Sequence, residues 1–173
     1  MNSHSDVSNG PSGQPNQSPE SKADLSSGED FLVRIAPLVL RRALGVTLLS
    51  ATADRFGIWG PPGAANVAWG DWTHFVGYTA KVNSFLPGVA APALAIIATA
   101  GEAFLGIALV LGVFHRAVAF ASAVLFALFA EAMTLSFGIK APLNYSVFAD
   151  AAATFVLSVL PATSNPKSNA ARQ

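Results

Sequence analysis

Four long apolar stretches constrain the fold of this chain more than any other feature. They run over residues 43–58, 88–114, 117–137 and 143–160. A helix needs about 20 mostly apolar residues to cross the hydrocarbon core of a bilayer, with some latitude at its ends. The first stretch reaches this length if Arg41 and Arg42 extend their charged groups to the lipid head groups. Charged residues make up only 12% of the chain, whereas soluble domains carry about 25%. We therefore expect an all-α, polytopic membrane protein.

The connections between these stretches predict the topology. The second and third stretches are separated by little more than His115 and Arg116, and the third and fourth by the sequence GIKAP. Short connections favour antiparallel neighbouring helices. We expect an up-down-up-down four-transmembrane-helix bundle within residues 31–162, with one long outer loop over 59–87. Residues 1–30 and 163–173 are polar and are expected to be disordered tails, because they contain too few apolar residues to bury.

Lysine and arginine residues predict the orientation of the bundle. Cytoplasmic segments carry an excess of these residues. With the N-terminus inside, six of those near the predicted spans are cytoplasmic: Arg34, Arg41, Arg42, Arg116, Lys167 and Arg172. Three are outside: Arg55, Lys81 and Lys140. We therefore expect a multi-pass protein of the inner membrane, in contact with the lipid bilayer, with both termini in the cytoplasm.

Five ionisable residues lie within or at the end of the apolar stretches and form the candidate polar pocket. They are Asp54, Arg55, Glu102, Glu131 and Asp150. Such residues are costly at membrane depth and usually face the interior of a bundle. Counted from the predicted helix ends at about 1.5 Å per residue, all except Glu102 belong to the outer half. We expect Arg55 to pair with Asp150 or Glu131, and Glu102 to lie deeper, near the midplane.

Small and polar residues accompany these carboxyl groups at helical spacing. Around Glu102 they are Ala95, Ala98, Thr99 and Gly106; before and after Glu131 they are Ala119, Ala123, Ala127 and Thr134. Around Asp150 they are Ser146, Thr154 and Ser158. Small residues let helices approach closely in a membrane. Two interpretations follow: the charges satisfy one another and hold the bundle in register, or they line a pocket that binds a small head group or passes protons.

The loop over 59–87 contains all three tryptophans of the chain. Trp59, Trp69, Trp72 and Tyr78 are candidates for a lid over the outer mouth of the bundle. Aromatic residues at this level also form interfacial belts. The sequence WGPPG favours turns, because proline ends helices and glycine permits left-handed backbone. A short interfacial helix is expected to begin after Asp71.

Several chemistries are excluded or disfavoured by composition. The chain has no cysteine, which rules out disulfide exchange, Cys-ligated iron–sulfur clusters and covalent c-type haem within it. Its three histidines do not form the pair that a membrane b-type haem needs, and His74 has no second ligand at a set spacing for a metal. No cofactor is therefore expected within the chain and no metal site. The net charge is zero and there is no basic tract for nucleic acid.

Several motifs together resemble the DoxX family of small four-helix bacterial membrane proteins. They are LRRALGVTLLSATADRFGIWGPPG, VAWGDWTHFVGYTAKVNSFLP, ATAGEAFLGIALVLG and FALFAEAMTLSFGIKAPLNYSVFADAAA. The resemblance covers residues 40–160. It implies an inner-membrane location and kinship with DoxD-type small subunits of thiosulfate:quinone oxidoreductase, which act with a partner chain on quinone. Arg41 and Gly45 match the family's Arg-x-x-Leu-Gly entry, and Glu102 matches its second-helix Glu. Glu131 departs from the pattern, where an apolar residue is expected.

Three functions are compatible with these features. The first is a redox-associated membrane subunit that binds a quinone-type head group in the outer-half pocket and works with an oxidoreductase partner chain. The second is a small proton or solute transporter or channel, suggested by the polar stripe around Asp150 and by Glu102 at mid-depth. The third is a non-catalytic accessory or structural membrane protein. Either a partner chain or a homo-oligomer is compatible with the sequence.

Overall fold

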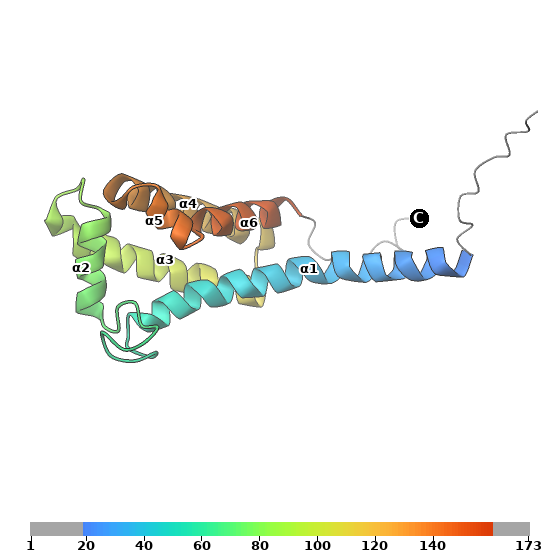
Figure 1. The fold of residues 1–173 in the computed structure, drawn as a ribbon, viewed down its shortest axis with the longest axis horizontal. Coiled ribbons are helices and arrows are strands. Elements are labelled where there is room, and N and C mark those ends of the chain that lie inside the picture. Colours follow the sequence, from blue (N-terminus) through green and yellow to red (C-terminus); the bar gives the residue numbers. More distant parts are fainter. Residues whose placement is uncertain (1–18, 161–173) are drawn as a thin grey trace, which may run out of the picture. The chain divides into compact units, whose positions relative to one another are not determined.

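The computed structural model describes residues 19–160, with side chains from residue 31 onward. Over this range the chain is all-helical. Its elements are α1 (Pro19–Asp54), α2 (Trp72–Val82), the 3-10 turn η1 (Gly88–Ala90), α3 (Ala91–Leu111), α4 (His115–Phe137), α5 (Lys140–Asn144) and α6 (Val147–Val159) (Figure 1). The chain divides into two compact units, Met1–Arg34 and Ile35–Gln173. The packing described below is that of the second unit.

The second and third predicted helices are confirmed. Two helical stretches, Gly88–Leu111 and His115–Phe137, are long and apolar enough to cross a membrane. The first of them ends where Gly112 adopts a left-handed conformation, with φ of 79°, and its N–H donates to the carbonyl of Ala108. Glycine suits this C-terminal position because it has no Cβ to clash. The chain then turns into α4, whose range agrees with the predicted 117–137.

The first predicted helix, 43–58, differs from the structure at both ends. α1 ends at Asp54 rather than at residue 58, because the chain then closes into turns in which Phe56 and Ile58 both donate to the carbonyl of Ala53. Gly57 follows in a left-handed conformation, with φ of 72°. α1 also includes residues 19–30, which were expected to belong to the disordered tail. The rest of both predicted tails, 1–18 and 163–173, lies outside the described residues.

The fourth predicted helix, 143–160, is wrong as a single element. The structure divides this stretch between α5 and α6, and α6 is apolar but only 13 residues long. The division occurs at Tyr145 and Ser146, where Ser146 takes a positive φ of 56°. A non-glycine residue in this region interrupts the regular helical hydrogen bonds.

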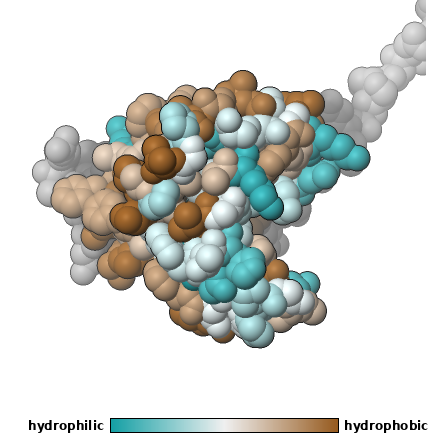
Figure 2. Space-filling model, turned by 90° about the vertical axis from the view of Figure 1, so that its left-hand side faces the viewer, coloured by the Kyte–Doolittle hydropathy of each residue, from teal (hydrophilic) through white to brown (hydrophobic). Residues whose placement is uncertain are grey.

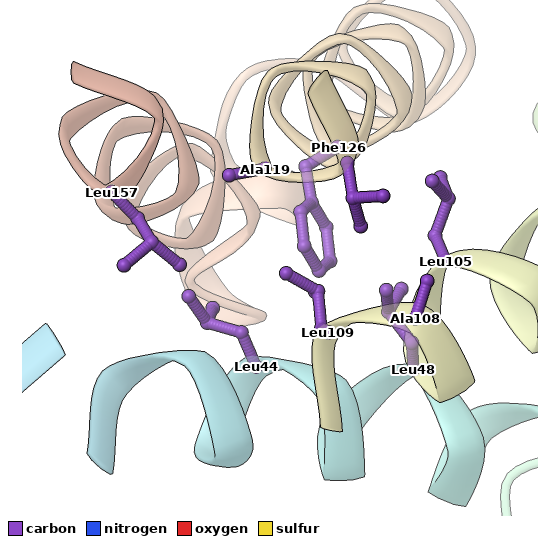
Figure 3. Packing of buried hydrophobic residues seen from close by; sticks show 9 residues of the cluster. Leu44, Leu48, Leu105, Ala108, Leu109, Ala119, Phe126 and Leu157 are labelled. Carbon is purple, nitrogen blue, oxygen red and sulfur yellow. The ribbon is translucent and has the colours of Figure 1, made fainter. Parts of the chain in front are cut away.

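The hydrophobic core of the second unit joins four helices. Leu44 of α1 points towards Leu157 of α6, and Leu48 of α1 lies beside Ala108 of α3 (Figure 3). Phe126 of α4 points into the same cluster. α6 packs chiefly on α4, and α3 also packs on α4. Burying a leucine or phenylalanine side chain stabilises a fold by about 1.5–3 kcal/mol. This cluster therefore provides the main attachment between the helices.

Two glycines set a close approach between α1 and α3. A Cβ at Gly45 would lie 2.9 Å from the carbonyl oxygen of Gly106, and a Cβ at Gly106 would lie 3.1 Å from that of Gly45. Neither helix can carry a larger residue there without moving apart. This contact confirms that the face of α3 predicted from small residues, including Ala95 and Gly106, is a packing face. It also brings the end of α1 beside the residues that precede Gly106 on α3.

Candidate functional site

An ion pair between Arg55 and Glu102 lies at the centre of the site. Nη2 of Arg55 donates to both carboxylate oxygens of Glu102, at 2.6 and 2.7 Å. Both residues are almost fully buried, with exposed fractions of 3% and 2%. Such charge-assisted hydrogen bonds are among the strongest in proteins. The prediction that Arg55 pairs with Asp150 or Glu131 is therefore wrong, and Glu102 is not an isolated carboxyl.

The pairing follows from where α1 ends. Arg55 comes directly after the last residue of α1, and its side chain reaches two residues in the middle of α3. Its Nη1 donates to the hydroxyl of Thr99 at 2.7 Å, and Thr99 and Glu102 share one face of α3 because they are three residues apart. Counting depth from helix ends gives the position of a Cα and leaves out the reach of a long arginine side chain. That omission separated Arg55 from Glu102 in the prediction.

Two aromatic rings cover the guanidinium of Arg55. Its Cζ lies 3.8 Å from the centroid of the Phe75 ring and 5.2 Å from that of Trp69. A cation over an aromatic face is attracted by the ring quadrupole, and the attraction is larger where water is excluded. Phe75 belongs to α2 and Trp69 to the loop before it. Arg55 is thus enclosed by residues from α2, α3 and the loop. The site role of Phe75 and Thr99 was not predicted, although both lie at helical spacing from residues that were.

Asp54 holds the loop instead of joining the ion pair. Its Oδ2 accepts hydrogen bonds from the backbone N–H groups of Ala68 and Trp69, at 3.1 and 2.7 Å. Asp54 is itself 5% exposed. Asp54 and Arg55 therefore point in different directions: Asp54 faces the loop and Arg55 faces α3. The carboxylate fixes Trp69 in the position from which its ring faces Arg55.

Glycine and proline residues give this loop its compact form. Gly70 has a positive φ of 73°, and a Cβ placed there would lie 2.6 Å from the carbonyl carbon of Pro61. A Cβ at Gly57 would lie 2.9 Å from the carbonyl oxygen of Gly70. The segment that contains Pro61 and Pro62 therefore packs directly on Gly70. The predicted turn chemistry of WGPPG is present, and the glycines are required by contact as well as by conformation.

The aromatic residues of the loop and α2 form one cluster that excludes Trp59. The centroid of the Trp69 ring lies 5.0 Å from that of Phe75 and 5.6 Å from that of Tyr78. The ring centroids of Trp72 and Phe75 are 5.8 Å apart. Trp59 is exposed, and its indole N–H donates to the carbonyl of Ser50 on α1. Three of the four predicted lid residues therefore belong to one aromatic cluster, in which Trp69 and Phe75 contact Arg55. Trp59 lies outside this cluster, beside α1.

The predicted short helix after Asp71 is α2, and Asp71 is its N-cap. The carboxylate of Asp71 accepts from the backbone N–H of His74 at 2.8 Å, as capping residues commonly do. Nδ1 of the His74 ring also lies 2.9 Å from Oδ1 of Asp71. These hydrogen bonds from His74 hold the pKa of Asp71 below its usual range. Burial raises the pKa of Tyr78, and the nearby Tyr145 adds to the shift.

The other two predicted pocket residues lie apart from the ion pair. Glu131 is exposed on α4, and Asp150 is half-buried on α6. Among residues 31–160, neither forms an ion pair. Glu131 misses the buried face because that face follows Ala119, Ala123, Phe126, Ala130 and Met133. The predicted stripe through Ala127 and Glu131 leaves this face within two turns. The predicted cluster of four charges in the outer half is therefore wrong.

The hydroxyl groups near Asp150 bond within their own helix. Thr154 donates to the carbonyl of Asp150 at 2.7 Å, and Ser158 donates to the carbonyl of Phe155 at 2.6 Å. On α4, Ser122 does the same with Val118. Thr154, Ser158 and Ser122 are all buried. Each of these hydroxyl hydrogens is therefore satisfied within its own helix.

Apolar and hydrophilic residues mix on the surface near the site. Figure 2 views the molecule from the side on which α2 lies, and shows hydrophobic patches next to hydrophilic ones (Figure 2). Large exposed apolar residues around the loop include Phe56, Ile58, Trp59, Phe85 and Leu86. Amphipathic surfaces of this kind suit the head-group region of a bilayer. The ion pair, the Asp54 contact and the aromatic cover thus lie beneath a surface of mixed polarity.

Comparison of the chain with protein-family models, with curated proteins and with solved structures gave no match.

Proposed function

We propose that this chain is a DoxX-like, multi-pass protein of the bacterial inner membrane that binds the head group of a quinone-type carrier at the Arg55–Glu102 pair. The observation that carries the proposal is a buried arginine–carboxylate pair covered by aromatic rings at the end of α1. An ionised pair in such a place is expensive, and ionisable residues at membrane depth mark functional sites by default.

The membrane placement is supported by what α3 and α4 leave uncovered. α3 exposes Ile96, Ile97, Phe104 and Ile107, and α4 exposes Phe120, Val124, Leu128 and Leu135. A core helix of a soluble protein buries residues of this size. We propose that α1 and the α5–α6 pair complete a four-helix, up-down-up-down bundle with α3 and α4. The charged groups of Arg41 and Arg42 then reach the cytoplasmic head groups, and the loop and α2 lie on the outer face.

The head-group assignment is supported by the chemistry around Arg55. A quinone presents a flat ring and carbonyl oxygens that accept hydrogen bonds. Rings of Trp69, Phe75 and Tyr78 provide flat apolar partners within one cluster. The guanidinium of Arg55 provides charged donors, and one of its nitrogens, Nε, is buried without a partner among the described residues. The electrons of such a carrier are exchanged with an oxidoreductase partner chain, which we propose associates with this one.

The two alternative functions have weaker support. A proton or solute transporter needs a polar path, but the hydroxyls of Ser122, Thr154 and Ser158 are bonded to their own helices. A non-catalytic accessory protein is the stronger alternative, because the Arg55–Glu102 pair also fastens the loop to α3. A buried pair of this kind adds little net stability compared with apolar residues. Ligand binding therefore explains the presence of the Arg55–Glu102 pair better than a purely structural role does.

Binding of a short-chain quinone tests this proposal. In a variant with Trp59→Phe and Trp72→Phe, Trp69 is the remaining tryptophan and reports on the site through its fluorescence. We expect saturable quenching by the quinone in detergent micelles, and loss of saturation in Arg55→Gln. Glu131→Gln, which changes an exposed carboxyl on α4, is the matched control and should bind normally. Quenching that is linear and equal in all three proteins would contradict the proposal in favour of an accessory role.

A further inference from the structure

Two adjacent residues of the site each keep one buried polar atom without a hydrogen-bond partner among the described residues. They are Oδ1 of Asp54 and Nε of Arg55. Both residues are more than nine-tenths buried. Buried polar atoms in native proteins are nearly always paired, and each exception calls for an explanation. The site therefore retains one acceptor and one donor after all its internal hydrogen bonds are made.

The other polar atoms of these two side chains are already used. Oδ2 of Asp54 accepts from the N–H groups of Ala68 and Trp69. Nη1 of Arg55 donates to Thr99 and Nη2 donates to Glu102. Trp69 connects the two groups, since its N–H binds Asp54 and its ring faces Arg55. The residues that carry the unpaired acceptor and the unpaired donor therefore both contact Trp69.

These two atoms require different hydrogen-bonding groups on a ligand. Nε of Arg55 is matched by any oxygen with a lone pair, so both a carbonyl and a hydroxyl satisfy it. Oδ1 of Asp54 accepts only, so it needs an O–H or N–H group. The carbonyl oxygens of a quinone carry no proton and would place a lone pair against this oxygen. The hydroxyl groups of the reduced form, the quinol, can donate to it.

We infer that Asp54 is a specificity-determining residue that makes the site select the reduced, hydroxyl-bearing form of the carrier over the oxidised form. This inference rests on the proposed function. A site built to bind a hydroxyl discriminates strongly against an analogue that lacks it, because its own polar atom is then left unpaired. We expect the quinol to bind about tenfold more tightly than the quinone, or better.

The substitution Asp54→Asn separates this role from the structural one. The two N–H groups of Ala68 and Trp69 require an oxygen opposite them, which fixes the orientation of the asparagine amide. Its NH2 group then replaces Oδ1 and converts the free acceptor into a donor. We expect the preference to reverse, so that the quinone binds more tightly than the quinol. A residue that only held the loop would weaken both forms alike and would not reverse their order.

Both forms are titrated by Trp69 fluorescence, the quinol under anaerobic conditions with excess reductant. Asp71→Asn makes the same chemical change at an exposed helix cap and should leave the preference as in the parent chain. If Asp54→Asn does not fold, the preference of the parent chain is still measured by its thermal stabilisation with each form. Equal affinity for the two forms, or no reversal in a folded Asp54→Asn protein, overturns the inference while leaving the proposed function intact. Binding of neither form overturns both.

Discussion

The guanidinium of Arg55 lies 3.8 Å from the centroid of the Phe75 ring while it donates to both carboxylate oxygens of Glu102. One side chain therefore connects the end of α1 with α2 and with α3. Because the three elements meet at a buried charge, removing either side of the ion pair leaves the other charge without compensation. Stability and ligand binding should both depend on this one contact.

Removing the carboxyl of Glu102 should destabilise the protein strongly. We expect Glu102→Ala to lower the free energy of unfolding by about 3–5 kcal/mol, because Arg55 is left buried and unpaired. Thermal unfolding in detergent micelles, followed by circular dichroism, measures this change. The double variant Arg55→Met with Glu102→Leu removes both charges and should recover most of the loss. If the double variant is as unstable as Glu102→Ala, the cost does not come from an uncompensated charge.

The same change at Glu131 should have little effect on folding. Glu131 is exposed on α4 and forms no ion pair among residues 31–160. We expect Glu131→Ala to change the free energy of unfolding by less than about 0.5 kcal/mol, as exposed sites usually do. The same unfolding assay compares it directly with Glu102→Ala. A large loss would show that the Glu131 carboxyl has a partner, such as a second copy of the chain.

Asp54 should control the local stability of the loop. In Asp54→Ala the N–H groups of Ala68 and Trp69 lose their shared acceptor. We expect the free energy of unfolding to fall by about 1–3 kcal/mol, with the loss concentrated in the loop rather than in α3 or α4. Hydrogen exchange, read by mass spectrometry, should show faster exchange over residues 56–71. Unchanged exchange in this segment would mean that the Asp54 contact does not hold the loop.

Helices that depend on a local sequence pattern were predicted better than the tertiary contacts between helices. α3 and α4 agree with their predicted ranges. Each is a long apolar run bounded by glycine or proline, and such a run specifies a helix without reference to the rest of the chain. α2 was predicted from its N-cap, Asp71. The division between α5 and α6 was missed, since the positive φ at Ser146 comes from the path of the chain and has no strong local signal.

The site was predicted in its residues but not in its pairing. Asp54, Arg55 and Glu102 were all selected because charges in apolar stretches need a partner. The choice among partners depends on where α1 ends and how far a side chain reaches, and both are properties of the tertiary structure. Arg55 therefore pairs with Glu102 and not, as was predicted, with Asp150. The contact of the Phe75 ring with Arg55 was missed for the same reason, because the two meet only when α2 packs on α3.

Gly70 should be less tolerant of substitution than Gly63. Both have a positive φ, 73° and 84°, so alanine costs about 1–2 kcal/mol in conformation at either position. A Cβ at Gly63 meets nothing within 4 Å, whereas one at Gly70 meets the backbone of Pro61 at 2.6 Å. We expect Gly70→Ala to lose substantially more stability than Gly63→Ala and to weaken quinone binding. Equal losses in the unfolding assay would indicate that the loop does not pack on Gly70.

The first turn of α2 should loosen in acid because of Asp71. Hydrogen bonds from His74 keep the pKa of Asp71 below its usual range, so the carboxylate is favoured in the folded protein. A lowered folded pKa contributes stability above the unfolded value, near 4. This contribution is lost as the pH falls through the folded value. In a variant with Trp72 as the remaining tryptophan, its fluorescence between pH 7 and pH 2 should change below about pH 4. Asp71→Asn keeps the cap but cannot titrate, so an unaltered pH profile in that variant would assign the transition to another group.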